Sequence, residues 1–156
     1  MIQEKLTFVS FEPYKDGYRA FLLLEDAIIS QTDPEEISDK ARIIYENAIK
    51  RTKKHISDIR AIRASRKPVT ARKVWEVGDA IFFMVDRLKE IGLQIDGVYD
   101  HLARDLGEKR KWFEKAIILR RYISEKELIP KSLNWGRLEK GTRKKAERLN
   151  LGLPLE

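Results

Sequence analysis

The chain has 156 residues, 42% of them hydrophobic, so it has the length of one ordinary domain and can bury a real core. It contains no cysteine, which excludes disulfides and thiolate metal sites, and its two histidines, His55 and His101, are too distant in sequence to form a local ligand pair. No apolar run approaches the ~18 to 20 residues of a membrane-spanning helix, and the first residues do not resemble a signal peptide. We therefore expect a soluble, cytoplasmic protein that uses no metal or cofactor.

Charge alternates in blocks along the chain. Residues 1–49 hold 5 basic and 10 acidic side chains, and residues 50–73 hold 10 and 1. Residues 74–107 hold 3 and 7, and residues 108–156 hold 14 and 7. Such segregation, with a net charge of +7, is typical of a protein that faces a polyanion on one side; a lysine-rich solvated surface is the alternative. The charged content of 37% also resembles that of thermophile proteins.

The first 32 residues are predicted to form an N-terminal appendage. Two apolar runs, at residues 6–9 and 21–24, flank a turn signal with the sequence PYKDG at residues 13–17. This pattern allows either a short β-hairpin or a short helix after the glycine.

A long helix is predicted from Pro34 to about Ser65. Asp33 suits the N-cap position, proline suits the first helical position, and Glu35 and Glu36 place acids in the first turn. Apolar residues then recur with a helical period at Ile37, Ala41, Ile44, Tyr45, Ala48, Ile49, Thr52, Ile56, Ile59 and Ile62. This stripe is typical of a core-facing helix, and it would also serve as a seam for a homodimer or a helical protein partner.

Three further helices are predicted after the long one. They cover about residues 71–91, with Thr70 as N-cap, residues 97–106, with Asp96 as N-cap, and residues 109–123. The side chains expected in the core are Trp75, Ile81, Phe82, Leu102, Leu106, Phe113 and Ile117.

The expected fold is mainly α, with a helical core at residues 33–123 and a basic C-terminal tail or helix at residues 124–156. Trp135 in this tail has two interpretations. It packs the tail onto the core, or it stacks on an unpaired base among the surrounding cations.

The helices at residues 97–123 match the helix-turn-helix template. Because the two helices of that motif cross steeply, it needs a small residue at position five, a left-handed turn at position nine, and apolar residues at positions four, eight, fifteen and eighteen. Counting from Tyr99, these places hold Leu102, Ala103, Leu106, Gly107, Phe113 and Ala116. The one departure is Glu108 at position ten, which is usually apolar. A purely structural helical corner is the alternative.

Basic residues at the start of the second helix of this motif favour DNA binding, because a recognition helix meets the major groove and the phosphates at that end. The candidate binding residues are Lys109, Arg110, Lys111, Lys115 and Arg120, with Lys50, Lys53 and Lys54 in the long helix and Arg143, Lys144 and Lys145 in the tail. Glu114 fits less well, because a carboxylate repels phosphate unless it accepts from a cytosine amino group or pairs with Arg110.

Short motifs in this region resemble a known family. They are WEVG at residues 75–78, LARDLG at 102–107, Trp112, RYI at 121–123 and NWG at 134–136. In this order they resemble the helical N-terminal domain of YhcG-type nucleases, over roughly residues 70–137. In that family the helical domain is associated with DNA binding, and a separate C-terminal domain of the PD-(D/E)XK type cuts the DNA. Because the chain ends at Glu156, we expect the binding module without the nuclease domain and carry over no catalytic residue.

Two functions are compatible with these patterns. The first is non-enzymatic binding of nucleic acid, with duplex DNA favoured over RNA. The second is a helical adaptor or assembly protein whose long helix packs on a partner and whose basic patches meet an acidic protein or RNA. A metal or acid–base site at Asp100, His101 and Asp105 is disfavoured, because adjacent residues on a helix point in different directions, and His101 is predicted on the helix surface.

Overall fold

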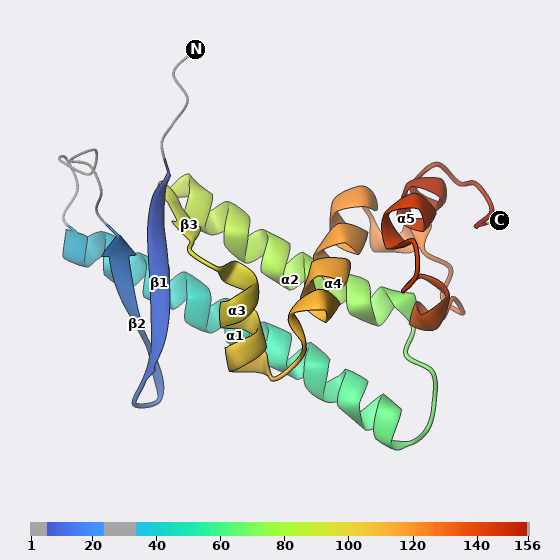
Figure 1. The fold of residues 1–156 in the computed structure, drawn as a ribbon, viewed down its shortest axis with the longest axis horizontal. Coiled ribbons are helices and arrows are strands. Elements are labelled where there is room, and N and C mark those ends of the chain that lie inside the picture. The colour runs from blue at the N-terminus through green and yellow to red at the C-terminus, as the bar shows by residue number, and fades with distance from the viewer. Residues whose placement is uncertain (1–5, 24–33, 156) are drawn as a thin grey trace, which may run out of the picture.

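Residues 6–23 and 34–155 are described in a computed structural model of the protein, and they confirm a mainly helical fold, with one small sheet near the N-terminus (Figure 1). The elements are β1 (Thr7–Tyr14), β2 (Gly17–Leu23), α1 (Pro34–Ala64), α2 (Ala71–Glu90), β3 (Leu93–Ile95), α3 (Val98–Leu106), α4 (Arg110–Tyr122), the 3-10 turns η2 (Lys126–Leu128) and η3 (Trp135–Arg137), and α5 (Thr142–Asn150). In the view of Figure 1, α3 and α4 cross in front of α1 and α2, and the sheet lies at the end of the molecule opposite α5. None of the described helices is both long and apolar enough to cross a membrane.

The N-terminal segment forms a β-hairpin, one of the two alternatives that the sequence leaves open. β1 and β2 pair antiparallel around a two-residue turn in which Lys15 has a positive φ of 51°. Side chains alternate along β1, so that Val9 and Phe11 are fully buried while Phe8 is exposed. β3 pairs in parallel with the other edge of β1, giving the strand order β2-β1-β3. The sequence does not predict β3, because the three residues Leu93–Ile95 are too few to show an alternation.

α1 has the predicted extent, from Pro34 to Ala64. Its predicted N-cap, Asp33, lies outside the described residues. The apolar stripe of α1 faces the protein's own core. Its buried members include Ile37, Ala41, Tyr45, Ile49, Ile56 and Ile59. Along the described α1, the large apolar side chain that is exposed is Ile43, at 48%.

The predicted cap of α2 is confirmed, and that of α3 is wrong. The Thr70 hydroxyl accepts a hydrogen bond from the backbone N–H of Lys73 (3.4 Å) at the start of α2. The N-cap of α3 is Gly97, with a φ of 67°, and no side chain caps this helix. Asp96 does not cap α3, because the chain enters the helix from β3 through a left-handed residue, a conformation that glycine adopts readily.

α3 and α4 meet at a corner that turns at Gly107, whose φ is 73°. Glycine adopts this left-handed conformation without the steric penalty of a side chain. The inward side chains of the corner are well buried: Leu102, Leu106, Phe113 and Ala116 are at most 4% exposed. The turn and these four side chains therefore have the conformation and burial expected from the sequence.

The predicted core is confirmed with one exception. The residues that are buried, each with 9% exposure or less, are Trp75, Ile81, Leu102, Leu106, Phe113 and Ile117. Phe82 is only half-buried, because it lies at the edge of α2 with the guanidinium of Arg120 4.8 Å from its ring centre.

The chain after α4 packs onto α2 and α4 and forms a second apolar cluster with them. Its buried side chains are Ile129, Leu133, Trp135, Leu138, Ala146 and Leu149. Trp135 is only 3% exposed, so of its two interpretations the packing role is correct and stacking on a base is not. An isolated β-bridge between Thr70 and Asn134 also joins this segment to the start of α2.

α2 and α4 approach each other closely at Gly78. A Cβ atom at this position would lie 2.2 Å from the carbonyl oxygen of Ala116 on α4. Two neighbours of Gly78 also bind α4: the Trp75 indole N–H donates to the carbonyl of Ile123 (2.9 Å), and Asp79 pairs with Arg120 (2.8 Å). The WEVG motif and the residue after it therefore position α4 on α2.

We expect Gly78→Ala to destabilise the protein by roughly 1 to 3 kcal/mol or more, because a backbone atom of α4 must move to admit the methyl group. Gly136→Ala is the matched control, since no atom lies within 4 Å of its Cβ position. Chemical denaturation of both variants measures the difference. A wild-type midpoint for Gly78→Ala would show that the two helices can separate at no cost.

Candidate nucleic-acid interface

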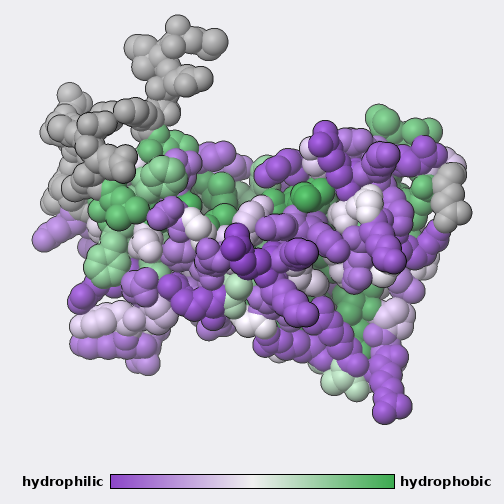
Figure 2. All heavy atoms as spheres, viewed as in Figure 1, coloured by the Kyte–Doolittle hydropathy of each residue, from purple (hydrophilic) through white to green (hydrophobic). Residues whose placement is uncertain are grey.

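The N-terminal turn of α4 carries exposed cations. Lys109, Arg110 and Lys111 are exposed, Lys115 is half-buried, and Phe113 between them points into the core. Arg110 pairs with Asp100 of α3 (3.1 Å), and not with Glu114. The three lysines form no ion pair with any residue in the described part of the chain. Figure 2 shows hydrophilic residues over the centre of this face, around α3 and α4.

The outer stripe of α4 extends from these lysines toward α5. Lys111, Lys115 and Tyr122 lie on this stripe because they are separated by four and seven residues. The guanidinium of Arg143, in α5, lies 5.0 Å from the Tyr122 ring centre. This contact brings the candidate residues of α4 and one of those of α5 onto a continuous surface. Lys144 is exposed, whereas Lys145 donates to the carbonyl of Arg137.

Glu108, the departure from the template, lies between two arginines of α1. Arg60 and Arg63 approach its carboxylate at 3.5 and 3.1 Å, and its side chain is 15% exposed. Arg60 also donates to the carbonyls of Leu106 (2.9 Å) and Gly107 (3.2 Å). The basic half of α1 thus fixes the turn between α3 and α4, and it neutralises a carboxylate that would otherwise stand beside the lysines of α4.

The candidates on α1 lie on one side of the helix, within an arc of about 100°. Lys53 precedes Arg60 by seven residues, so it lies on the stripe that faces the α3–α4 turn. Lys54 points about 100° away from Lys53, as successive helical residues do. Lys50, Lys53 and Lys54 are exposed and form no ion pair with described residues, whereas the neighbouring Arg51 pairs with Asp79 (3.5 Å).

Arg120 differs from the other candidates. Its guanidinium pairs with Asp79 (2.8 Å) and lies 5.2 Å from the ring centre of Trp75, and its side chain is 23% exposed. These contacts hold α4 on α2, and they leave little of the charge available to a ligand.

His101 is buried, so its prediction as a helix-surface residue is wrong. It is 7% exposed, and its Nε2 accepts the backbone N–H of Phe11 (3.0 Å). The other ring nitrogen, Nδ1, must then carry the hydrogen, which it donates to the carbonyl of Gly97 (3.0 Å). This neutral imidazole ties α3 to β1. No group of three His, Cys, Asp or Glu side chains in the described residues could hold a metal ion.

A second buried contact joins α3 to α1 and β1. The Tyr45 hydroxyl donates to Asp105, whose side chain is 2% exposed, and Arg104 binds the same carboxylate (2.8 Å). Arg104 also donates to the carbonyl of Phe11 (2.7 Å). Burial, followed by the hydrogen bond to Asp105, raises the pKa of the Tyr45 phenol well above its ordinary value.

No protein-family model, curated protein or solved structure matches this chain.

We expect Tyr45→Phe to remove part of the protein's sensitivity to alkali. The raised pKa means that the folded state holds this proton more tightly than the unfolded state, so stability is complete below about pH 10 and falls as the pH rises above it. The variant lacks this contribution, and it loses roughly 1.5 to 3 kcal/mol at neutral pH with the bond to a charged acceptor. Denaturation midpoints between pH 7 and about 11 measure both effects. Equal declines above pH 10 in the two proteins would contradict this assignment.

Proposed function

We propose that the protein binds duplex DNA without catalysing a reaction, with α3 and α4 acting as a helix-turn-helix and the start of α4 as its recognition element. The observation that carries the proposal is the set of lysines at the start of α4, namely Lys109 at its N-cap and Lys111 and Lys115 within the helix, which have no carboxylate partner among the described residues. They stand at the helix end that enters the major groove in this motif.

The contrast between paired and unpaired cations supports this choice of surface. Cations between the helices have carboxylate partners within the protein: Arg60 and Arg63 share Glu108, and Arg51 and Arg120 share Asp79. Unpaired cations on an outer helix face leave a local positive potential, and this is what attracts a polyanion.

The corner between α3 and α4 also supports a helix-turn-helix. Gly107 has the left-handed conformation that the motif needs, and the inward positions are filled by buried apolar side chains. The resemblance of residues 70–137 to the DNA-binding domain of YhcG-type nucleases agrees with the same proposal. The adaptor alternative is weaker, because the apolar stripe of α1 is covered by the protein's own core and leaves Ile43 exposed along the described helix.

The test is the salt dependence of duplex binding, measured by fluorescence anisotropy. Each phosphate contact releases condensed counterions, so the affinity of the wild type should fall steeply as salt rises. Alanine at Lys109, Lys111 and Lys115 together should flatten the log–log slope by up to about 2.7, since each lost contact removes about 0.9. Folding should survive, because surface substitutions usually change stability by no more than about 0.5 kcal/mol each.

The matched control replaces Lys50, Lys53 and Lys54 by alanine, which removes the same charge from α1. We expect a smaller loss that is equal for all duplex sequences, as for a general electrostatic contact. Unchanged binding in the α4 variant, with binding lost in the α1 variant, would place the site on the long helix and reject α4. Single-stranded DNA and RNA of the same sequence test the choice of ligand, and tighter binding of either would reject duplex DNA.

A further inference from the structure

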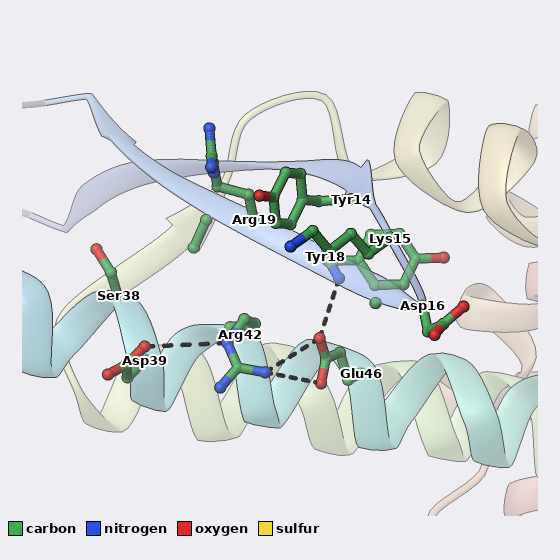
Figure 3. A pocket seen from close by; sticks show the side chains of 11 residues that line it. Tyr14, Lys15, Asp16, Tyr18, Arg19, Ser38, Asp39, Arg42 and Glu46 are labelled. Atoms are coloured by element: carbon green, nitrogen blue, oxygen red, sulfur yellow. Dashed lines mark hydrogen bonds and ion pairs between the residues drawn. The ribbon is translucent and has the colours of Figure 1, made fainter.

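The tip of the β-hairpin carries two cations around an exposed aromatic ring. Tyr14, the last residue of β1, is 46% exposed. The guanidinium carbon of Arg19 lies 4.3 Å from its ring centre, and the ammonium of Lys15 lies 5.2 Å from it. Figure 3 shows these side chains at the end of the hairpin, above α1.

Lys15 occupies an unusual position for a lysine. Its φ of 51° falls in the left-handed region, where tight hairpin turns normally have glycine, asparagine or aspartate. A lysine therefore makes this turn less stable than the usual residues would. A strained residue at an exposed tip is a reason to look for a function of its charge.

Two of the carboxylates near the tip, Glu12 and Glu46, are bound to other arginines. Glu12, which stands opposite Arg19 in the strand register, approaches Arg104 of α3 at 3.5 Å. Arg42 of α1 pairs with Glu46 (3.1 Å) and with Asp39 (3.9 Å). Neither Lys15 nor Arg19 forms an ion pair with a described residue, so their charges are available to a ligand.

Two contacts fix the hairpin relative to the helices. The backbone N–H of Tyr18 donates to Glu46 of α1 (3.0 Å), beside an open groove of about 580 Å³ between β2 and α1 (Figure 3). Arg104 donates to the carbonyl of Phe11 (2.7 Å). Lys15 is four residues beyond Phe11, so the tip projects about 13 Å past this contact. Figure 1 shows the hairpin turn and the turn before α4 on the same side of the molecule.

We propose that the hairpin tip is a second binding element, in which Lys15 and Arg19 contact the phosphate backbone of the duplex beside the segment that α4 occupies. The inference rests on the proposed function, because it assumes the same DNA ligand. The hairpin tip adds a contact that flanks the α4 site. A duplex reaches the tip only if it is longer than the segment that α4 occupies. Asp16, also exposed at the tip, opposes this contact by repelling phosphate.

The experiment compares Lys15→Asn/Arg19→Gln with the wild type on duplexes of about 10 and about 25 base pairs, one and more than two helical turns. On the long duplex the variant should flatten the log–log salt slope by about 1.8, for two lost phosphates, and on the short duplex the slope should stay unchanged. Its thermal midpoint should not fall, because asparagine tolerates a positive φ better than lysine. Asp16→Asn should bind the long duplex more tightly.

The control is Arg87→Gln/Lys89→Gln, near the end of α2, where Arg87 pairs with Glu90 (3.8 Å). Like the tip variant, it removes one exposed lysine and one arginine that lies over an exposed ring, since the guanidinium carbon of Arg87 is 5.6 Å from the ring centre of Phe83. These residues lie near the end of the sheet opposite the tip. Equal losses in this control and the tip variant would overturn the inference, as would equal losses of the tip variant on both duplex lengths. An unchanged slope for the tip variant while the α4 variant loses binding would reject the tip alone. A wild type that binds neither duplex would reject the proposed function itself.

Discussion

The close approach of α2 and α4 at Gly78 is the constraint on which the rest of the structure depends. There is space for no side chain at this point, because the Ala116 carbonyl oxygen lies 2.2 Å from where a Cβ atom would be. Because only a glycine allows this close approach, α2 and α4 cross at Gly78. The Trp75–Ile123 hydrogen bond and the Asp79–Arg120 ion pair then fix the rotation of α4 about its axis. This rotation turns Phe113 into the core and leaves the lysines of the first turn facing outward.

Ion pairing inside the protein decides which charges remain for a ligand. Asp79 of α2 binds Arg51 of α1 and Arg120 of α4, so a single carboxylate joins three helices. Glu108 does the same for the α3–α4 turn and α1 through Arg60 and Arg63. Pairs of this kind contribute little where both partners are exposed, but here the two carboxylates are half-buried, with side chains 27% and 15% exposed, and they stabilise one packing arrangement. In the described part of the chain, the cations without such partners include those at the start of α4, on one side of α1 and at the hairpin tip.

Much of the fold could be predicted from the sequence, because local signals agree with tertiary packing along α1, α2 and α4. The apolar period and the Thr70 cap require only nearby residues, and so does the glycine at position 107. The errors concern residues whose environment comes from distant parts of the chain. β3 exists as a strand because β1 offers an edge, and His101 is buried because the backbone of Phe11, 90 residues away, donates to its ring. Arg120 has the sequence pattern of a surface cation, and only the proximity of Asp79 gives it an internal role.

The hairpin tip is basic although the charge blocks along the sequence give no sign of it. Lys15 and Arg19 lie in the acidic block of residues 1–49, where carboxylates outnumber cations by 10 to 5. A charge count treats every carboxylate as equally close to every cation, whereas a strand register and a helix face assign each one a specific neighbour. Glu12 is the cross-strand neighbour of Arg19, and it approaches Arg104 instead because α3 is held against β1 by His101 and Asp105. The packing of α3 on the sheet thus leaves Arg19 without Glu12 as an ion-pair partner. The hairpin tip therefore carries unpaired positive charge although it belongs to an acidic segment of the sequence.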